Sequence, residues 1–82
     1  MKRYTVLLFG PAAAAFGQGR VTIEAKANCS CGQLEVKLGE QCPSLAGFID
    51  AGRLAVDQAF VGEDEPIEPG AEIALISMVS GG

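Results

Sequence analysis

One amphipathic helix between residues 30 and 42 most restricts what this 82-residue chain can fold into. Ser30 and Gln33 have the spacing of a capping box, in which each side chain bonds the backbone N–H of the other residue. Apolar residues follow on one helix face at spacings of three, four and four: Cys31, Leu34, Leu38 and Cys42. Pro43 then ends the helix. Two internal glycines weaken such a helix by about 1 kcal/mol each, so burial of the apolar face must hold it in place.

Extended segments on both sides of the helix can supply the surface that buries it. The alternation in residues 20–25 predicts a strand with one exposed face, whereas the nearly continuous apolar run in 4–9 predicts a central strand covered on both faces. We expect a single helical turn within 10–19, a short apolar turn or helical piece at 45–49, extended segments at 53–58, 60–61 and 72–79, and a turn-rich loop at 63–70. The order β-β-α-β-β predicts an α+β roll in which a mixed sheet packs on one helix. We assign residues 1–79 to this domain and 80–82 to a flexible tail.

Charge excludes one class of partner. The formal net charge is −4, and no cluster of Lys or Arg is available to bind phosphates, so nucleic acid is not an expected partner. Acidic residues gather late in the chain, at Asp57, Glu63, Asp64, Glu65, Glu68 and Glu72. They form either a solvated loop that aids solubility or an acidic patch that docks on a basic partner.

The start of the chain imitates a secretory signal peptide, because Lys2-Arg3 precedes an apolar stretch. Gly10-Pro11 interrupts that stretch, however, and its removal would take a strand from a small domain. No run approaches the roughly twenty apolar residues that span a membrane. We therefore expect a cytoplasmic protein that does not bind membranes, and the odd number of cysteines agrees with a reducing compartment.

Few residues are equipped for catalysis. The chain has no histidine, which excludes Ser-His-Asp and Cys-His arrangements, and it has no phosphate-binding loop. Cys31 and Cys42 lie on the apolar helix face, where cysteine packs like a small hydrophobe. Cys29 precedes the helix and is the one cysteine expected to be exposed. Three cysteines without a fourth ligand do not complete a structural zinc site.

The C-terminus is the remaining candidate. The last predicted strand runs into Ser80-Gly81-Gly82. Glycines lack Cβ atoms, so a Gly-Gly end can thread a narrow channel and present an unhindered carboxylate. Such a carboxylate becomes reactive once it is an acyl-adenylate, which a sulfur nucleophile can attack. The alternative is a frayed chain end.

Four segments, "VLLFG" at 6–10, "AVDQAFV" at 55–61, "PGAEIA" at 69–74 and "VSGG" at 79–82, resemble the small subunit of molybdopterin synthase, a ubiquitin-like sulfur-carrier family. The resemblance implies a β-grasp fold and three partners: a ubiquitin-activating-type adenylyltransferase, a sulfur donor protein and the large synthase subunit. It also implies that Gly82, preceded by Gly81, is adenylated and converted to a thiocarboxylate that gives sulfur to a pterin precursor. ATP and magnesium would belong to the activating partner, and this chain would bind no cofactor or metal.

The resemblance also suggests which residues contact partners. By position these are Phe9, Phe60, Ile76, Met78 and Ser80. Alternation supports part of this set, because Ile76 and Met78 face outward if Ile73 and Leu75 face the core. An outward apolar patch on a small domain usually marks an interface, although a rolled sheet could instead bury these residues.

Other functions remain open at this point. A related carrier could serve thiamine thiazole formation or tRNA thiolation. A β-grasp interaction module could use its sheet face and never its tail, so deletion of Gly82 would not affect it. A cysteine-based metal or redox protein would depend on Cys29, Cys31 and Cys42.

Overall fold

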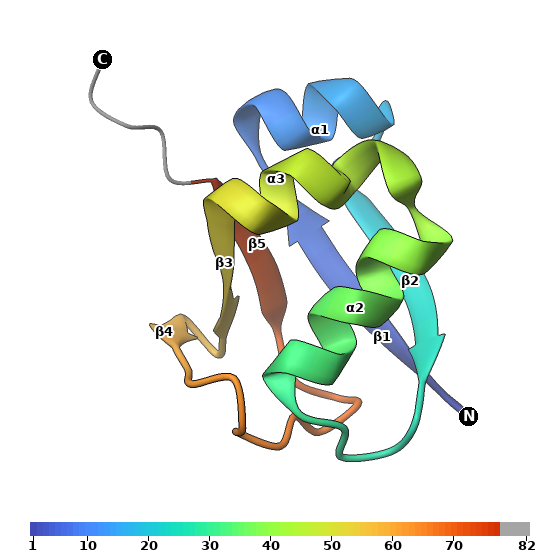
Figure 1. The fold of residues 1–82 in the computed structure, drawn as a ribbon, viewed down its shortest axis with the longest axis vertical. Coiled ribbons are helices and arrows are strands. Elements are labelled where there is room, and N and C mark those ends of the chain that lie inside the picture. Colours follow the sequence, from blue (N-terminus) through green and yellow to red (C-terminus); the bar gives the residue numbers. More distant parts are fainter. Residues whose placement is uncertain (78–82) are drawn as a thin grey trace.

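The computed structural model of the chain describes residues 1–77 and has the α+β architecture that the sequence predicts (Figure 1). Its strands are β1 (Lys2–Leu8), β2 (Arg20–Ala25), β3 (Gly52–Val56), β4 (Ala59–Phe60) and β5 (Ile73–Ser77). Its helices are α1 (Gly10–Phe16), α2 (Cys31–Gln41) and α3 (Ala46–Ala51), with a short 3-10 helix, η1 (Pro43–Leu45). The predicted tail and the last two residues of the predicted final strand lie outside the described residues.

The strands form one mixed sheet in the order β2-β1-β5-β3-β4. β1 and β5 are a parallel pair near the middle of the sheet, with Leu8 beside Leu75. β2 runs antiparallel to β1, and β3 runs antiparallel to both β5 and β4. The last strand therefore lies between the first and third strands.

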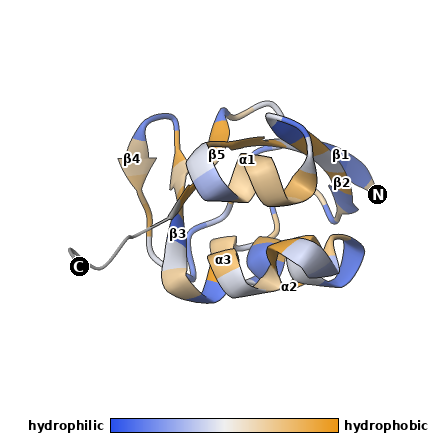
Figure 2. Ribbon diagram, turned by 90° about the horizontal axis from the view of Figure 1, so that it is seen from above, coloured by the Kyte–Doolittle hydropathy of each residue, from blue (hydrophilic) through white to orange (hydrophobic). Residues whose placement is uncertain are grey.

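α2 begins where the sequence predicts, because the capping box forms. The Gln33 N–H donates to Ser30 Oγ at 3.2 Å, and the Ser30 N–H donates to Gln33 Oε1 at 3.0 Å. The helix buries Cys31, Leu34 and Leu38. α2 and α3 contact each other and lie over the same face of the sheet (Figure 2).

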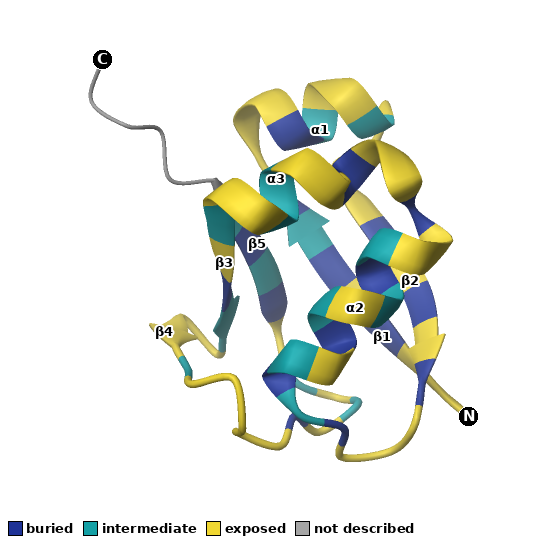
Figure 3. Cartoon of the chain, viewed as in Figure 1, coloured by how far each residue is buried: buried dark blue, intermediate teal, exposed yellow. Residues whose placement is uncertain are grey.

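The core lies between that sheet face and the helices. Buried and exposed residues alternate along β1 and β2, as Figure 3 shows. The largest fully buried side chains come from both layers and from the loop before β5: Tyr4, Val6, Ile23, Leu34, Leu38, Leu45, Leu54, Ile67, Ile73 and Leu75. Each of the large aliphatic ones contributes about 1.5–3 kcal/mol through burial. The predicted stripe of α2 is thus buried.

β1 differs from the prediction, because only one of its faces is covered. Tyr4, Val6 and Leu8 are buried, whereas Thr5 is exposed and Leu7 is only half-buried. The continuous apolar run was wrongly interpreted as two-sided burial. Leu7 is instead an apolar residue on the open outer face of the sheet.

The order β-β-α-β-β is confirmed, and the shorter connecting segments are more regular than it implies. The 10–19 connection holds seven helical residues rather than one turn, since Pro11 suits the first turn and Gly17, with φ 90°, ends the helix in the left-handed conformation. Residues 46–51 form a helix where a short turn or helical piece was expected at 45–49. Ala59 and Phe60 form a two-residue strand beside β3, one residue before the extended segment expected at 60–61.

The acidic loop between β4 and β5 is tied to the rest of the fold through Ile67, which is fully buried. The Ile67 N–H donates to the Cys29 carbonyl at 2.9 Å. The Tyr4 hydroxyl lies 2.7 Å from the Lys26 carbonyl and 3.1 Å from that of Ile67. These contacts fix the start of α2 and the loop that leads into β5.

Candidate functional site

The outer face of the sheet carries an apolar row that crosses four strands. Leu7 of β1 lies beside Ala74 of β5, Ala74 beside Ala55 of β3, and Ala55 beside Phe60 of β4. The alanine side chains are small, so the surface is lower at Ala74 and Ala55 than at the larger side chains of Leu7 and Phe60, and the alanines form the floor between them. The result is a groove of about 440 Å³, here called the sheet-face groove, lined by Leu7, Phe9, Ala55, Gln58, Phe60, Glu72, Ala74 and Ile76.

Two aromatic side chains in this groove are unusually exposed for their type. Phe9 has 54% of its surface exposed and Phe60 has 49%. The Arg53 guanidinium lies 4.9 Å from the centre of the Phe60 ring, within the range of a cation–π contact. Arg53 also pairs in register with Ile76. The exposed apolar surface of the groove therefore has a cation, Arg53, beside it at Phe60.

A tight turn presents Phe60 to the groove. Val56 pairs with Ala59, so Asp57 and Gln58 form a two-residue hairpin loop. Both have positive φ, 52° and 70°, as a type I′ turn requires. The Asp57 N–H donates to the Glu72 carbonyl at 2.7 Å, and the Glu72 N–H donates to Asp57 Oδ1 at 3.0 Å. These bonds join the hairpin to the residue that precedes β5.

The structure brings together three of the sequence-predicted site residues, Phe9, Phe60 and Ile76, which all line the sheet-face groove. Ile73 and Leu75 are fully buried, as the alternation predicts. Met78, Ser80, Gly81 and Gly82 lie outside the described residues. Sequence reasoning missed Leu7, Ala55 and Ala74.

The missed residues carry a weak signal in the sequence. Leu7 lies two residues before Phe9, and Ala74 two before Ile76, so each shares a face with a predicted site residue. The pairing of Ala74 with both Leu7 and Ala55 depends on strand register, which the sequence does not provide. Local alternation could therefore have found the face but not the groove.

Close packing surrounds the last described residues of β5. Gly52 pairs with Ser77, and a Cβ at Gly52 would lie 2.8 Å from the Phe48 carbonyl oxygen and closer still to that of Ile76. Real Cβ atoms do not approach backbone oxygens so closely. A glycine at this position is needed to pair β3 with the end of β5.

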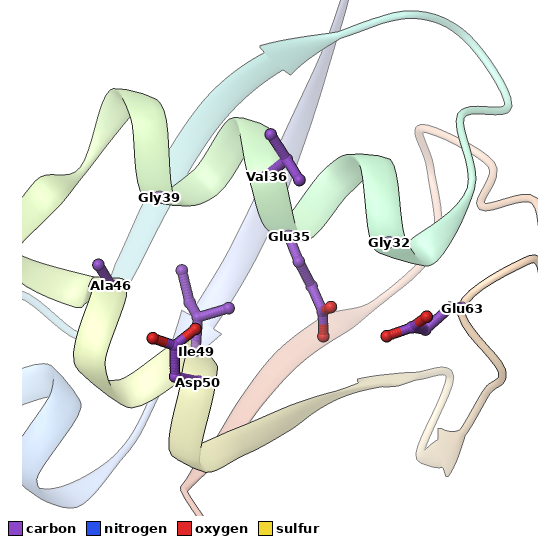
Figure 4. Close-up of a pocket in the computed structure, with 8 residues that line it drawn as sticks. All are labelled: Gly32, Glu35, Val36, Gly39, Ala46, Ile49, Asp50 and Glu63. Carbon is purple, nitrogen blue, oxygen red and sulfur yellow. The ribbon is translucent and has the colours of Figure 1, made fainter.

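A second hollow, of about 440 Å³, lies between α2 and α3 on the helical side (Figure 4). In Figure 4 the Glu35 and Glu63 side chains point toward one another, while Asp50 lies on α3. Partial burial and the Glu63 charge raise the pKa of Glu35, and Arg53 partly offsets them. This hollow is acidic, in contrast to the apolar sheet-face groove.

All three cysteines are buried, which corrects the expectation that Cys29 is exposed. Cys29 is covered because the loop containing Ile67 packs against the start of α2. Burial, with smaller contributions from Glu35 and Glu63, raises the pKa of Cys31 to about 11. Burial also raises the pKa of Cys42. Such thiols are poor nucleophiles at neutral pH.

Residues 1–77 hold neither a cluster of metal ligands nor a helix that could span a membrane. Within this part of the chain, no group of three or more His, Cys, Asp or Glu side chains is arranged to hold a metal ion. None of the helices in the same residues is both long and apolar enough to cross a membrane.

Comparison with known proteins identifies the family. The model of the ThiS family matches residues 6–82. The chain belongs to the ThiS family. This is a family of ubiquitin-like sulfur carriers, and the match includes both the strands of the sheet-face groove and the C-terminal glycines. No curated protein matches this ThiS-family chain.

Solved structures confirm the ubiquitin-like β-grasp fold. SAMP1 from Haloferax volcanii superposes with a TM-score of 0.81 at 22% identity, over 98% of this chain and 99% of that one. Subunit 1 in a complex of subunits 1 and 2 of the molybdopterin-converting factor from Helicobacter pylori gives 0.68 at 22% identity, over 98% and 99%. A Caldiarchaeum subterraneum ubiquitin gives 0.63 at 17% identity, over 99% and 98%. At these identities the likeness establishes the fold of the ThiS-family chain.

Proposed function

We propose that this chain is a sulfur carrier that acts through the carboxylate of Gly82 as the small subunit of molybdopterin synthase. The observation that carries the proposal is the family match, which extends to residue 82 and so includes the terminal Gly-Gly. The ubiquitin-like fold and the exposed apolar groove support it, because a carrier must dock on each enzyme that handles its tail. The buried cysteines also support it, since they leave the chain's own thiols a poor choice for the sulfur.

The proposed chemistry has two steps at Gly82. A carboxylate oxygen attacks the α-phosphorus of ATP on an activating enzyme of the ubiquitin-activating type, and pyrophosphate leaves. Hydrosulfide delivered by a sulfur donor protein then attacks the carbonyl carbon, and AMP leaves, which gives a thiocarboxylate. ATP and magnesium are bound by the activating enzyme rather than by this chain.

The assignment to the pterin pathway is more specific than the assignment to sulfur transfer in general. The four segments that resemble the molybdopterin synthase small subunit support it, as does the likeness to a protein solved as subunit 1 of a two-subunit molybdopterin-converting factor. The loaded tail would enter the large subunit, which supplies the catalytic groups, and its sulfur would pass to the pterin precursor. Docking would use the sheet-face groove, with Phe9, Phe60 and Ile76 as contacts, and Met78 and Ser80 would lie along the tail.

A second use of the same adenylate is protein modification. The likeness to SAMP1, which is a small archaeal modifier protein, favours this alternative. In that case a lysine amine of a target protein, rather than sulfur, would attack the Gly82 carbonyl. The two outcomes differ in the product: a thiocarboxylate in one case and an isopeptide conjugate in the other.

Exchange of labelled pyrophosphate into ATP tests the activation step directly. We expect exchange when the intact chain is mixed with its host's activating enzyme and Mg-ATP, and none when Gly82 is deleted. The thermal unfolding midpoint of the deletion variant is measured beside that of the intact chain, so that a loss of exchange is not mistaken for unfolding. Exchange that persists without Gly82, or a set of host activating enzymes that never supports exchange, would overturn the proposal.

A further inference from the structure

The free edge of the sheet at β2 is partly covered by one side chain. Among residues 1–77, β2 has a neighbouring strand only on its β1 side, so its other side presents backbone groups to the surroundings. The Glu24 N–H donates to Gln41 Oε1 at 3.1 Å, and Gln41 Nε2 donates to the Glu24 carbonyl at 2.8 Å. A neighbouring antiparallel strand would make this same pair of bonds. The Gln41 amide thus occupies the place of an added strand at one position.

The rest of the edge can pair with a strand. Backbone groups alternate between the two sides of a strand, so Arg20 and Thr22 present theirs in the same direction as Glu24. Gln41 covers only Glu24. Since its two bonds lie at the exposed surface, their loss on displacement costs about 1 kcal/mol each, which new bonds to an incoming strand would replace.

A hollow of about 260 Å³ continues this edge between the end of β2 and α2. Its lining includes Ala25 and Lys26 from the β2 side and Gln33 and Lys37 from α2. Lys37 is one helical turn before Gln41, so both residues lie on the same side of α2. The hollow can therefore accept side chains from a segment that follows the β2 edge.

Basic residues are concentrated around this edge. Five of the six basic residues of the chain belong to β1, β2, α2 or the residue after β2: Lys2, Arg3, Arg20, Lys26 and Lys37. The same elements carry three carboxylates: Glu24 is opposite Arg3 in register, Glu40 is 3.5 Å from Lys37, and Glu35 lines the hollow between α2 and α3. The edge still has a net positive charge in a chain whose total is −4. Two copies of such an edge would repel each other.

We propose that the β2 edge binds an extended acidic segment of a partner protein, which pairs with β2 in place of the Gln41 side chain. Its carboxylates would lie against Lys26 and Lys37. β2 is at the opposite end of the sheet order from β3 and β4, which help to line the sheet-face groove. The chain can therefore hold this partner while the groove is occupied. The proposal does not depend on sulfur transfer.

Titration of the isotope-labelled full chain with a synthetic peptide of alternating valine and glutamate, blocked at both ends, tests this directly by NMR. We expect the largest shifts at the amides of Thr22 and Glu24 and at the Gln41 side chain. A peptide with glutamine in place of glutamate should bind about tenfold more weakly, as the loss of two exposed ion pairs predicts. Equal binding of both peptides, shifts confined to β3–β5, or no binding would overturn the proposal.

Variants test the two lysines and the Gln41-covered edge of β2 separately. The double substitution Lys26→Gln with Lys37→Gln should weaken binding of the acidic peptide about tenfold. Arg53→Gln should leave it unchanged, because β3 lies toward the opposite end of the sheet from β2. Gln41→Ala should strengthen binding, because the edge is then uncovered. Dimerisation of Gln41→Ala in place of peptide binding would show that the edge pairs with a second copy, and this would contradict the proposed occupant.

Discussion

Asp57 and Glu72 are joined by two hydrogen bonds, one through backbone groups at 2.7 Å and one from the Glu72 N–H to Asp57 Oδ1 at 3.0 Å. Asp57 belongs to the turn before β4, and Glu72 immediately precedes β5. The pair therefore connects the hairpin that carries Phe60 to the strand that leads toward the tail. Aspartate suits this position because its side chain accepts a bond while its backbone has a φ of 52°.

Replacements of Asp57 test these two properties together. Asp57→Ala should lower the free energy of unfolding by about 2 kcal/mol, because it loses a side-chain hydrogen bond and places alanine at a positive φ. Asp57→Asn keeps an acceptor oxygen and tolerates that φ, so it should remain within about 0.5 kcal/mol of the parent. Urea denaturation measures both. Equal losses for the two variants would contradict this account of the turn.

Two glycines give opposite predictions for the same substitution. Gly52→Ala should destabilise the fold by more than about 3 kcal/mol, because its Cβ would collide with the carbonyls of Phe48 and Ile76. Gly39→Ala should stabilise it by up to about 1 kcal/mol, since the new Cβ would lie 3.8 Å from Ile49 Cδ1 within a helix. Thermal unfolding of the two variants checks this. A stable Gly52→Ala variant would show that the end of β5 tolerates displacement.

Removal of an exposed side chain from the sheet-face groove should weaken partner binding without lowering the stability of the fold. Phe60→Ala removes an exposed ring that rests beneath Arg53, so it should weaken binding to the large subunit and to the activating enzyme at least tenfold. Val36→Ala is the matched control, because Val36 is also exposed but lies on α2. Calorimetric titration of each partner measures the effect. If Val36→Ala weakens binding more than Phe60→Ala, docking uses the helical side instead.

The cysteines should be unreactive while the protein is folded. None of the three should be labelled by iodoacetamide at neutral pH in minutes, and all three should be labelled in denaturant. The thiolate of Cys31 forms only near its raised pKa of about 11, so alkylation of Cys31 should appear as the pH approaches that value. Mass spectrometry of the labelled peptides measures each site. Rapid labelling of Cys29 in the folded state would show that the loop containing Ile67 opens readily.

Local signals predicted some parts of the fold well. The capping box, the apolar stripe and Pro43 placed α2 correctly because a helix is defined by neighbours within a few residues. Alternation likewise gave the bounds of β2. These elements depend on little beyond their own sequence.

Long-range contacts account for what was missed. Leu7 was expected to be covered because alternation separates the two faces of β1 without showing whether the helices cover one of them or both. The burial of Cys29 depends on Ile67, which lies far away in the sequence. The floor of the sheet-face groove requires the register that places Ala74 between Leu7 and Ala55. The face was therefore predictable from the sequence, and the groove was not.

The most direct test of the central claim is the intact mass of the protein purified from its own host and after treatment with its activating enzyme, Mg-ATP and a sulfur donor. The account predicts an increase equal to the replacement of one oxygen by sulfur, localised to the C-terminal peptide and absent when Gly82 is deleted. A C-terminus that stays unmodified with every activating enzyme of the host would contradict the carrier function.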